Sequence, residues 1–257
     1  MQENRNLVSI IMPAYNAASY IEDSIKSVIA QTHTEWELII VDDCSDDGTY
    51  DVIKKFEDSR IIYFRNEKNS GAAVSRNRAL REAKGKWVAF LDCDDTWQES
   101  KLEKQIKFME ENKYKFSYTD YNIIYPDGTK SPYIYIGPMV VTKKLLYRYC
   151  YFSTITVMYE REAIGLIQIA DIRKNNDYAM WFQAIEKADC YRLPECLSTY
   201  WKRENSISSG SKFKLIKWHY IMFRKALSKG VFVSAFCTVR NLFWGVIKKI
   251  YYKEKII

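Results

Sequence analysis

The sequence contains one stretch, KWVAFLDCDDT at residues 86–96, in which a short apolar run leads directly into three carboxylates. A run of five or six apolar residues is typical of a strand that is covered on both faces of its sheet. Neighbouring carboxylates repel one another and raise each other's pKa, and a divalent cation usually relieves that repulsion. Mg²⁺ binds one or two carboxylates and leaves its other positions to water and phosphate oxygens. The stretch therefore predicts a metal–phosphate site at the carboxyl end of a central strand.

The same residues have a simpler explanation. Asp is a preferred N-cap residue, so residues 92–95 could form a solvated turn before a helix that begins near Trp97. The strand ends earlier in the chain favour the metal–phosphate interpretation, because they also carry polar groups.

The first 115 residues alternate between apolar, strand-like runs and amphipathic, helical patterns. We expect strands at residues 8–12, 36–41, 60–64 and 86–91, and helices at about 19–32, 46–56 and 72–83. This alternation, with short loops, is typical of βαβ units with right-handed crossovers. The sequence therefore predicts an α/β fold with a Rossmann-like, mostly parallel central sheet and helices on both faces.

Polar groups follow each of the four predicted strands, at residues 13–16, 42–43, 69–71 and 92–95. Ligands of open parallel sheets bind outside the carboxyl ends of the strands, so these groups should converge on one nucleotide site. The chain has neither G-x-G-x-x-G nor G-x-x-x-x-G-K-[ST], which excludes the usual dinucleotide and P-loop modes of phosphate binding. We expect a metal on the 92–95 turn and the guanidinium of Arg76 to hold the phosphates instead.

These segments resemble the family 2 glycosyltransferases, which have the GT-A fold. The matching pieces are VSIIMPAYN (8–16), WELIIVDDCSDDGT (36–49), NSGAAVSRN (69–77) and FLDCDD (90–95). They have the family's order and spacing and cover about the first 115 residues. The inverting enzymes that build bacterial cell-surface polysaccharides are the members that this chain resembles.

The resemblance implies a nucleotide-sugar donor, most often linked to UDP, and a divalent cation, Mg²⁺ or Mn²⁺. It implies that Asp42 binds the base and that Arg76 lies near the base and the diphosphate. In the D-x-D motif, Asp92 would lie by the ribose and Asp94 would bind the metal, whereas Asp43 and Asp95 receive no definite role. The residues implied to line the nucleoside pocket are Pro13, Tyr15 and Asn16.

Residues 1–115 are thus expected to be the donor half of the domain, and residues 116–210 its acceptor-binding and catalytic half. We expect a hairpin over residues 115–136 and a strand at 153–159. Family members commonly carry an acidic pair before an aromatic helix, and this chain has Asn176-Asp177 there. The second position is the family's general base, so the resemblance implies that Asp177 deprotonates the acceptor. The alternative is that Asp177 only caps the helix.

A further segment, residues 197–208, resembles the family's Tyr-Arg-x-x-x-x-Ser motif. Arg203 and the serines that follow it would close over the donor diphosphate or the acceptor. Lys202 competes with Arg203 for this alignment, and a generic strand and loop is the alternative.

The net charge of +7 is concentrated in the C-terminal part of the chain. Residues 201–257 hold 13 Lys or Arg against two Glu, whereas residues 1–200 hold 26 bases against 30 acids. We expect residues 211–257 to be a basic, amphipathic helical tail with a thin polar stripe at Ser234, Thr238, Asn241, Gly245 and Lys248. Such a tail suits an anionic bilayer surface, and the alternative is a helical pair packed on the core or in a homodimer. Nucleic acid is not expected as a partner, because the tail aromatics are predicted to be buried.

The six cysteines are scattered without a C-x-x-C pair, which favours a reducing compartment. The polar N-terminus has no signal-peptide pattern, and we expect no membrane-spanning helix. We therefore expect a cytoplasmic enzyme that is peripheral on the inner face of the cytoplasmic membrane.

The sequence thus predicts inverting transfer of a sugar from a nucleotide-sugar, expected to be UDP-linked, to a hydroxyl of a saccharide or lipid-linked acceptor. Two alternatives remain. Residues 91–96 also fit the D-x-D-x-T signature of haloacid dehalogenase-type phosphotransferases, in which Asp92 would be the nucleophile. The chain could also bind nucleotide-sugars without catalysis.

Overall fold

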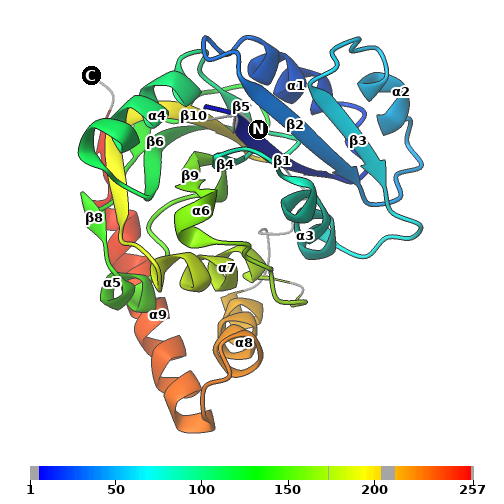
Figure 1. Cartoon of the computed structure of the whole chain (residues 1–257). Coiled ribbons are helices and arrows are strands. Elements are labelled where there is room, and N and C mark those ends of the chain that lie inside the picture. Colours follow the sequence, from blue (N-terminus) through cyan, green and yellow to red (C-terminus); the bar gives the residue numbers. More distant parts are fainter. Residues whose placement is uncertain (1–5, 173, 204–211, 256–257) are drawn as a thin grey trace.

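The computed structural model describes residues 6–172, 174–203 and 212–255, and it has a single mixed sheet at its centre (Figure 1). The strands are β1 (Val8–Ala14), β2 (Trp36–Asp42), β3 (Ile61–Arg65), β4 (Trp87–Phe90), β5 (Thr96–Trp97), β6 (Phe116–Ile124), β7 (Tyr133–Tyr135), β8 (Val140–Val141), β9 (Val157–Glu160), β10 (Cys190–Trp201) and β11 (Lys253–Lys255). The helices are α1 (Ile21–Ile29), α2 (Thr49–Ile53), α3 (Ala72–Glu82), α4 (Lys101–Asn112), α5 (Lys143–Arg148), the 3₁₀ helix η1 (Thr154–Thr156), α6 (Arg161–Ile164), α7 (Asn176–Ile185), α8 (Lys212–Ile221), the π-helix η2 (Met222–Ala226) and α9 (Val231–Tyr251).

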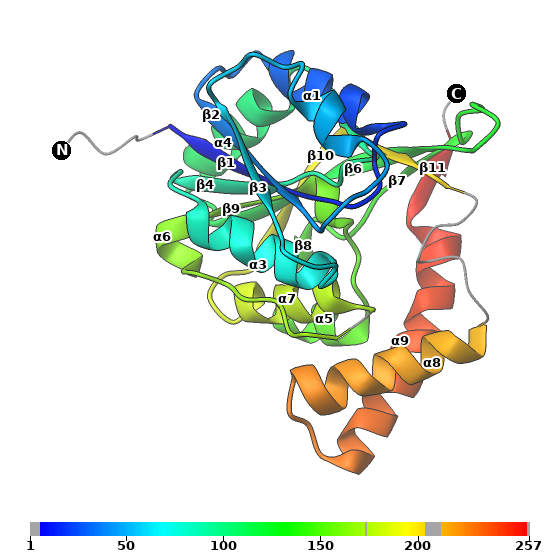
Figure 2. The ribbon, with the colours of Figure 1, turned by 90° about the vertical axis from the view of Figure 1, so that its right-hand side faces the viewer.

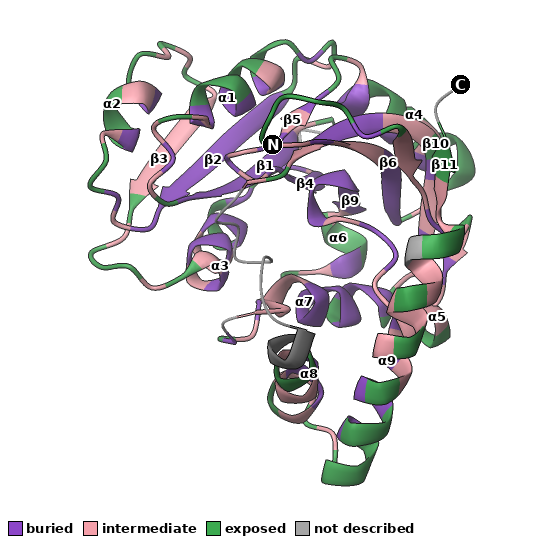
Figure 3. Ribbon diagram, turned by 180° about the vertical axis from the view of Figure 1, so that it is seen from behind, coloured by how far each residue is buried: buried purple, intermediate pink, exposed green. Residues whose placement is uncertain are grey.

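The predicted α/β architecture is confirmed in the first half of the chain. Strands β4, β1, β2 and β3 lie side by side and are all parallel. Every residue of β1, β2 and β4 is buried, as Figure 3 shows for the sheet centre, which explains why these strands are mostly apolar. Alternate residues of these strands pack against α1 and α4 on one face and against α3 and α7 on the other.

The second half of the sheet is more mixed than the sequence suggested. Strand β9 runs antiparallel to both β4 and β6, and the predicted hairpin pairs β6 with β7 through Tyr121 and Tyr135. The strand expected at residues 153–159 begins only at Val157, because residues 154–156 form η1. The helix expected from Trp97 begins at Lys101, because Thr96 and Trp97 pair with β10.

Strand β10 is longer than the sequence indicated, running over 12 residues parallel to β6. Its pairing register shifts between Leu193 and Cys196 and again between Cys196 and Ser198. Pro194 has no N–H to donate to a neighbouring strand, so a bulge here is expected, and it interrupts the alternating pattern that would identify a strand. The strand ends at Trp201, next to the carboxyl end of β4.

The C-terminal helices α8 and α9 form an arm that extends away from the sheet (Figure 2). Helix α9 ends near the sheet again, because β11 follows it and pairs with β7. Contrary to the sequence expectation, residues 231–248 of α9 are long and apolar enough, by length and composition alone, to cross a membrane. This is the one such helix among the described residues.

Helix α4 buries a lysine completely, and this burial predicts a pH-dependent stability. Lys101 is 0% exposed; its Nζ donates to Gln105 Oε1 at 2.8 Å and lies 4.1 Å from the Trp97 ring centroid. Burial lowers the pKa of Lys101 to about 7. Above that pH the unfolded chain binds the proton that the folded chain has lost, so stability should rise as pH increases from about 7 towards the unfolded pKa near 10.

We expect Lys101→Met to raise the melting temperature at pH 7, because each pKa unit corresponds to about 1.4 kcal/mol and the shift is of several units. The stabilisation should shrink at pH 10, and thermal unfolding at both pH values measures it. Lys107→Met is the matched control, because Lys107 lies on the same helix with its side chain 71% exposed. Equal effects of the two substitutions would contradict the prediction.

Candidate active site

The turn after β4 brings Asp92 against Arg76, which α3 supplies. The two side chains form an ion pair through Arg76 Nη2 and Asp92 Oδ1, and Arg76 is only 8% exposed. Burial opposes the charge of Arg76, but the negative charges of Asp92 and Asp177 outweigh it and raise the pKa of Arg76. The guanidinium therefore lies in the field of both carboxylates, one from each half of the domain.

The other two carboxylates of the turn are in different environments. Asp94 is partly exposed, and burial together with the nearby charge of Asp92 raises its pKa to about 6, while Arg203 opposes this. Asp95 is fully buried; its Oδ1 accepts a hydrogen bond from the backbone N–H of Trp201 at 2.8 Å. Its Oδ2 has no hydrogen-bond partner among the described residues, and burial raises the pKa of Asp95 well above its usual value.

These carboxylates fit a divalent cation. Burial first, and then the neighbouring carboxylates, raise the pKa values of Asp94 and Asp95, and one Asp95 oxygen has no hydrogen-bond partner among the described residues, so a cation would stabilise the charged forms here. Within the described parts of the chain, no three His, Cys, Asp or Glu side chains form a ready-made metal cluster. Mg²⁺ and Mn²⁺ accept one or two protein carboxylates with phosphate oxygens and water, and the partly exposed Asp94 can offer its oxygens in this way.

Asp42 is buried at the end of β2 in a network of hydrogen bonds. Its Oδ1 accepts from the backbone N–H of Ser45 at 2.9 Å and from the Ser45 hydroxyl at 2.5 Å. Its Oδ2 accepts from the Tyr63 hydroxyl at 2.8 Å. Ser45 Oγ in turn accepts from the backbone N–H of Asn16 at 2.9 Å, so the loop after β1 and the loop after β2 are tied together.

The three residues implied to line the nucleoside pocket lie at the carboxyl end of β1. Pro13 is buried within β1 and pairs in register with Val41 of β2. Tyr15 is 47% exposed, and Asn16 has a left-handed backbone with φ of 46°. Asn16 Oδ1 also accepts from the backbone N–H of Asp46 at 3.2 Å, so the two loops share a second contact.

Asp43, which had no definite role in the sequence, fixes the loop before α3. Its carboxylate accepts from Asn66 Nδ2 and from the backbone N–H groups of Ser70 and Gly71, at 2.6–3.1 Å. Gly71 has φ of +90°, a conformation that favours glycine, and α3 begins at the next residue. Asp43 therefore sets the start of the helix that carries Arg76.

Asp177 lies in the first turn of α7, half-buried. Its Oδ2 accepts from the Thr154 hydroxyl at 3.2 Å, and its Oδ1 accepts from the backbone N–H of Tyr178 at 2.8 Å. The N-cap position of α7 is Asn175, which makes no side-chain capping hydrogen bond, whereas the Asp177 carboxylate accepts from a backbone N–H of the first turn. Thr154 was not identified from the sequence, because a lone Thr in η1 carries no motif.

Arg203, rather than Lys202, lies against the D-x-D turn. Arg203 Nε is 3.7 Å from Asp94 Oδ2, and the guanidinium lies 4.0 Å from the Tyr20 ring centroid. Lys202 is exposed, and its Nζ lies 5.5 Å from the Tyr125 ring centroid instead. The serines predicted to follow Arg203 lie outside the described residues.

Comparison with known proteins is consistent with this site. The family model described as glycosyl transferase family 2 matches residues 9–164. The chain belongs to glycosyltransferase family 2. A Bacillus subtilis (strain 168) protein named a teichuronic acid biosynthesis glycosyltransferase, TuaG, is 43% identical over 91% of this chain and 94% of its own length. The family, the enzyme class and the α/β fold predicted from the sequence are therefore confirmed.

Two further relatives cover most of this family 2 chain. Escherichia coli WfaP, named a UDP-Glc:alpha-D-GlcNAc-diphosphoundecaprenol beta-1,3-glucosyltransferase, is 35% identical over 97% of this chain and 98% of its own. The crystal structure of Staphylococcus aureus TarS 1–349 in complex with UDP-GlcNAc superposes with a TM-score of 0.70 and 22% identity, covering 91% of this chain and 71% of that one. The latter likeness supports the GT-A fold alone.

The phosphotransferase alternative does not fit this glycosyltransferase. Its signature normally follows the first strand of the sheet, whereas residues 91–96 follow the fourth. Asp92 is also held in an ion pair with Arg76. That contact would oppose its use as a nucleophile.

The contrast between Arg203 and Lys202 gives a test. We expect Arg203→Ala to weaken UDP binding about ten- to a hundredfold, because a guanidinium next to the D-x-D turn makes charge-assisted hydrogen bonds to a diphosphate. Lys202→Ala removes a charge one residue away and should leave UDP affinity within about twofold. Isothermal titration of both variants with UDP measures this, and equal losses would reject the assignment of Arg203.

Proposed function

We propose that this glycosyltransferase moves a sugar with inversion from a UDP-sugar to a hydroxyl of a lipid-linked saccharide. The observation that carries the proposal is the pair of guanidinium groups at the donor turn: Arg76 forms an ion pair with Asp92, and Arg203 Nε lies 3.7 Å from Asp94 Oδ2. A donor diphosphate bound at these groups would lie within the electrostatic influence of Asp177, whose negative charge helps to raise the pKa of Arg76. The relative WfaP is named for a UDP-sugar donor and a diphosphoundecaprenol-linked saccharide acceptor. This supports the same two substrate classes for the present chain.

The donor would bind across the carboxyl ends of β1, β2 and β4. Pro13, Tyr15 and Asn16 would line the nucleoside pocket, with Asp42 at the base and Asp92 at the ribose. Arg76 and Arg203 lie on either side of the D-x-D turn, where their positive charges suit a diphosphate.

Asp94 would hold Mg²⁺ or Mn²⁺ against the diphosphate. Such a cation supplies positive charge that stabilises the negative charge appearing on the departing UDP. Arg76 and Arg203 would contribute to the same stabilisation through fixed guanidinium groups, which need no rearrangement during the reaction.

Asp177 would act as the general base. Its Oδ2, oriented by the Thr154 hydroxyl, takes the proton of the acceptor hydroxyl. The acceptor oxygen then forms a bond to the anomeric carbon on the face opposite UDP, the bond to UDP breaks, and the configuration inverts. The hydrogen bond from the Tyr178 N–H to Asp177 Oδ1 fixes the orientation of this carboxylate at the start of α7.

A polyprenyl-diphosphate acceptor stays in the bilayer, so the enzyme would act at the cytoplasmic face of the membrane. The product would be a growing polysaccharide, in line with the teichuronic acid biosynthesis for which TuaG is named. The sequence-based expectation of a cytoplasmic enzyme that is peripheral on the inner face of the cytoplasmic membrane is the same position.

Asp177→Asn keeps the size of the side chain and removes its basicity. We expect the rate of transfer to fall about 10²- to 10⁴-fold, with UDP-sugar affinity unchanged. The readout is product formation on a lipid-linked GlcNAc acceptor, alongside calorimetric titration of UDP. Asp171→Asn makes the same change at an exposed carboxylate six residues earlier and should retain full activity. Full activity of the Asp177→Asn variant would refute the assignment of the base.

The role of Asp94 can be measured without transfer. We expect Mn²⁺ to tighten UDP binding to the unmodified protein, and Asp94→Ala to remove most of that gain while leaving the weaker, metal-free affinity. Titrations with and without Mn²⁺ compare the two proteins. A gain that survives in the variant would show that Asp94 is not the ligand. A thermal-shift screen of UDP-sugars with Mn²⁺ then identifies the donor.

A further inference from the structure

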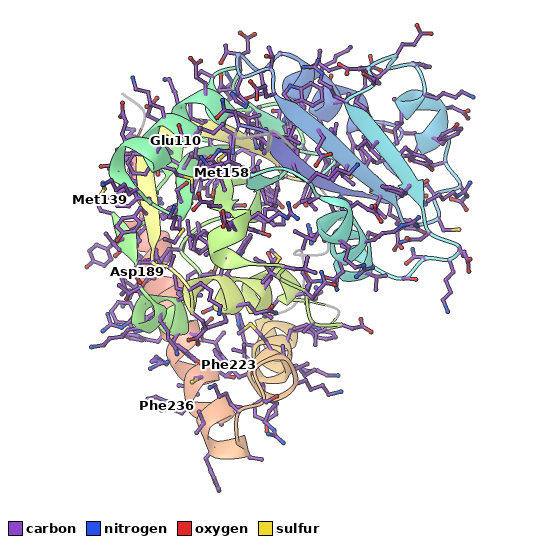
Figure 4. The ribbon with its side chains drawn as sticks, in the orientation of Figure 1. Glu110, Met139, Met158, Asp189, Phe223 and Phe236 are labelled. Carbon is purple, nitrogen blue, oxygen red and sulfur yellow. The ribbon has the colours of Figure 1, made fainter. Side chains whose placement is uncertain are left out.

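Helix α9 has its apolar side chains on the outside. Six of them form a continuous stripe at intervals of three and four residues along one face, and each is at least 60% exposed. They are Phe232, Phe236, Val239, Phe243, Val246 and Ile250. Figure 4 shows Phe236 on the side of α9 away from α8, whereas the fully buried Phe223 lies between the two helices.

The polar residues of α9 face the protein instead. Ser234, Thr238 and Asn241 belong to the thin polar stripe predicted from the sequence, and all three are buried. Asn241 Nδ2 donates to the Tyr178 hydroxyl at 2.7 Å, and Lys248 Nζ donates to the backbone oxygen of Cys150 at 3.2 Å. A water-exposed helix has the opposite arrangement, with apolar residues inward, so α9 is inside-out with respect to water.

The expectation that the tail aromatics are buried is wrong for the aromatic side chains of this stripe. Three phenylalanines of α9 are between 60% and 90% exposed. Single exposed apolar residues are common on protein surfaces, but a contiguous patch of six large ones marks a surface that another apolar phase covers.

The charge of the tail decides which phase this is. Residues 205–253 contain no Asp or Glu, and Lys217 and Lys225 within this segment are exposed. A second copy packed on the stripe would bring two segments of the same charge together without the acidic partners that helix–helix interfaces use to pair with lysines. An anionic bilayer surface complements both the apolar stripe and the basic charge.

The packing of α9 also indicates how it would meet the bilayer. Gly245 lies against the Tyr149 ring, where an added Cβ would be 2.8 Å from Tyr149 Cε2, and Arg240 donates to the backbone oxygen of Tyr147 at 3.2 Å. The strand β11 that follows α9 is part of the central sheet. A helix held along the domain in this way lies on a membrane rather than across it.

We propose that α9 lies in the plane of the cytoplasmic leaflet, with its apolar stripe inserted among the acyl chains and its polar stripe against the catalytic domain. The 21-residue helix is about 31 Å long, so the contact extends over several lipid head groups. Asn241 contacts Tyr178, the residue after Asp177, so the same helix would hold the acceptor half of the site at the lipid surface. This last step rests on the proposed lipid-linked acceptor, whereas membrane binding itself does not.

The test uses the full chain with phosphatidylcholine vesicles, with and without phosphatidylglycerol. We expect the protein to sediment with the vesicles, more strongly when they carry phosphatidylglycerol. Phe236→Ser combined with Phe243→Ser should lower the bound fraction about tenfold or more, because two large apolar side chains leave the bilayer. The matched control is Met139→Ser combined with Leu166→Ser, which changes two side chains of similar exposure outside α9 and should bind like the unmodified protein.

UDP titration of the stripe variant in solution monitors its fold, and unchanged UDP affinity is expected. Unchanged vesicle binding of the stripe variant, or no binding by the unmodified protein to either vesicle, would overturn the proposal. Sedimentation without vesicles measures the oligomeric state. If the unmodified protein is a dimer and the stripe variant is a monomer, the stripe binds a second copy of the chain and the membrane proposal is overturned. If the unmodified protein binds vesicles but does not bind UDP, the proposed function is rejected and the proposal of a membrane-binding surface is retained.

Discussion

The arrangement of the site depends on one buried positive charge. Arg76 lies among apolar side chains at the start of α3 and pairs with Asp92, while the charge of Asp177 also favours its protonated form. An unpaired guanidinium at this depth would be costly, so the ion pair with Asp92 holds the donor turn against α3. The same ion pair also marks where a diphosphate could approach the site.

Around this charge, two carboxylates also position the backbone of neighbouring segments. Asp43 gathers the loop that starts α3, and Asp95 accepts from the backbone of Trp201 and so fixes the end of β10 beside the D-x-D turn. Arg203 follows two residues later and lies next to Asp94 because of that anchor. Acidic residues at strand ends therefore have two kinds of role in one motif, and neighbours in sequence have different ones.

The C-terminal arm combines two surfaces with opposite requirements. One face of α9 offers hydrogen-bonding groups to the catalytic domain, and the other offers only apolar side chains to its surroundings. The burial pattern in Figure 3 shows this division along the helix. In a lipid environment the polar face of α9 would make hydrogen bonds to the protein, and its apolar face would contact the acyl chains. Neither face would then be exposed to an unfavourable environment.

The sequence alone determined the parallel strands, their helices and the family, because buried runs and motifs at strand ends are local patterns. It did not reveal the bulged strand β10, where Pro194 interrupts the alternation, or the choice between Arg203 and Lys202, which are adjacent in sequence but point to different rings. The sequence also identified the polar stripe of α9, but not whether that stripe faces the catalytic domain or the surroundings. Tertiary structure decided these points, because the direction a side chain faces depends on what the rest of the chain packs against it, and a linear pattern fixes only which residues share a face.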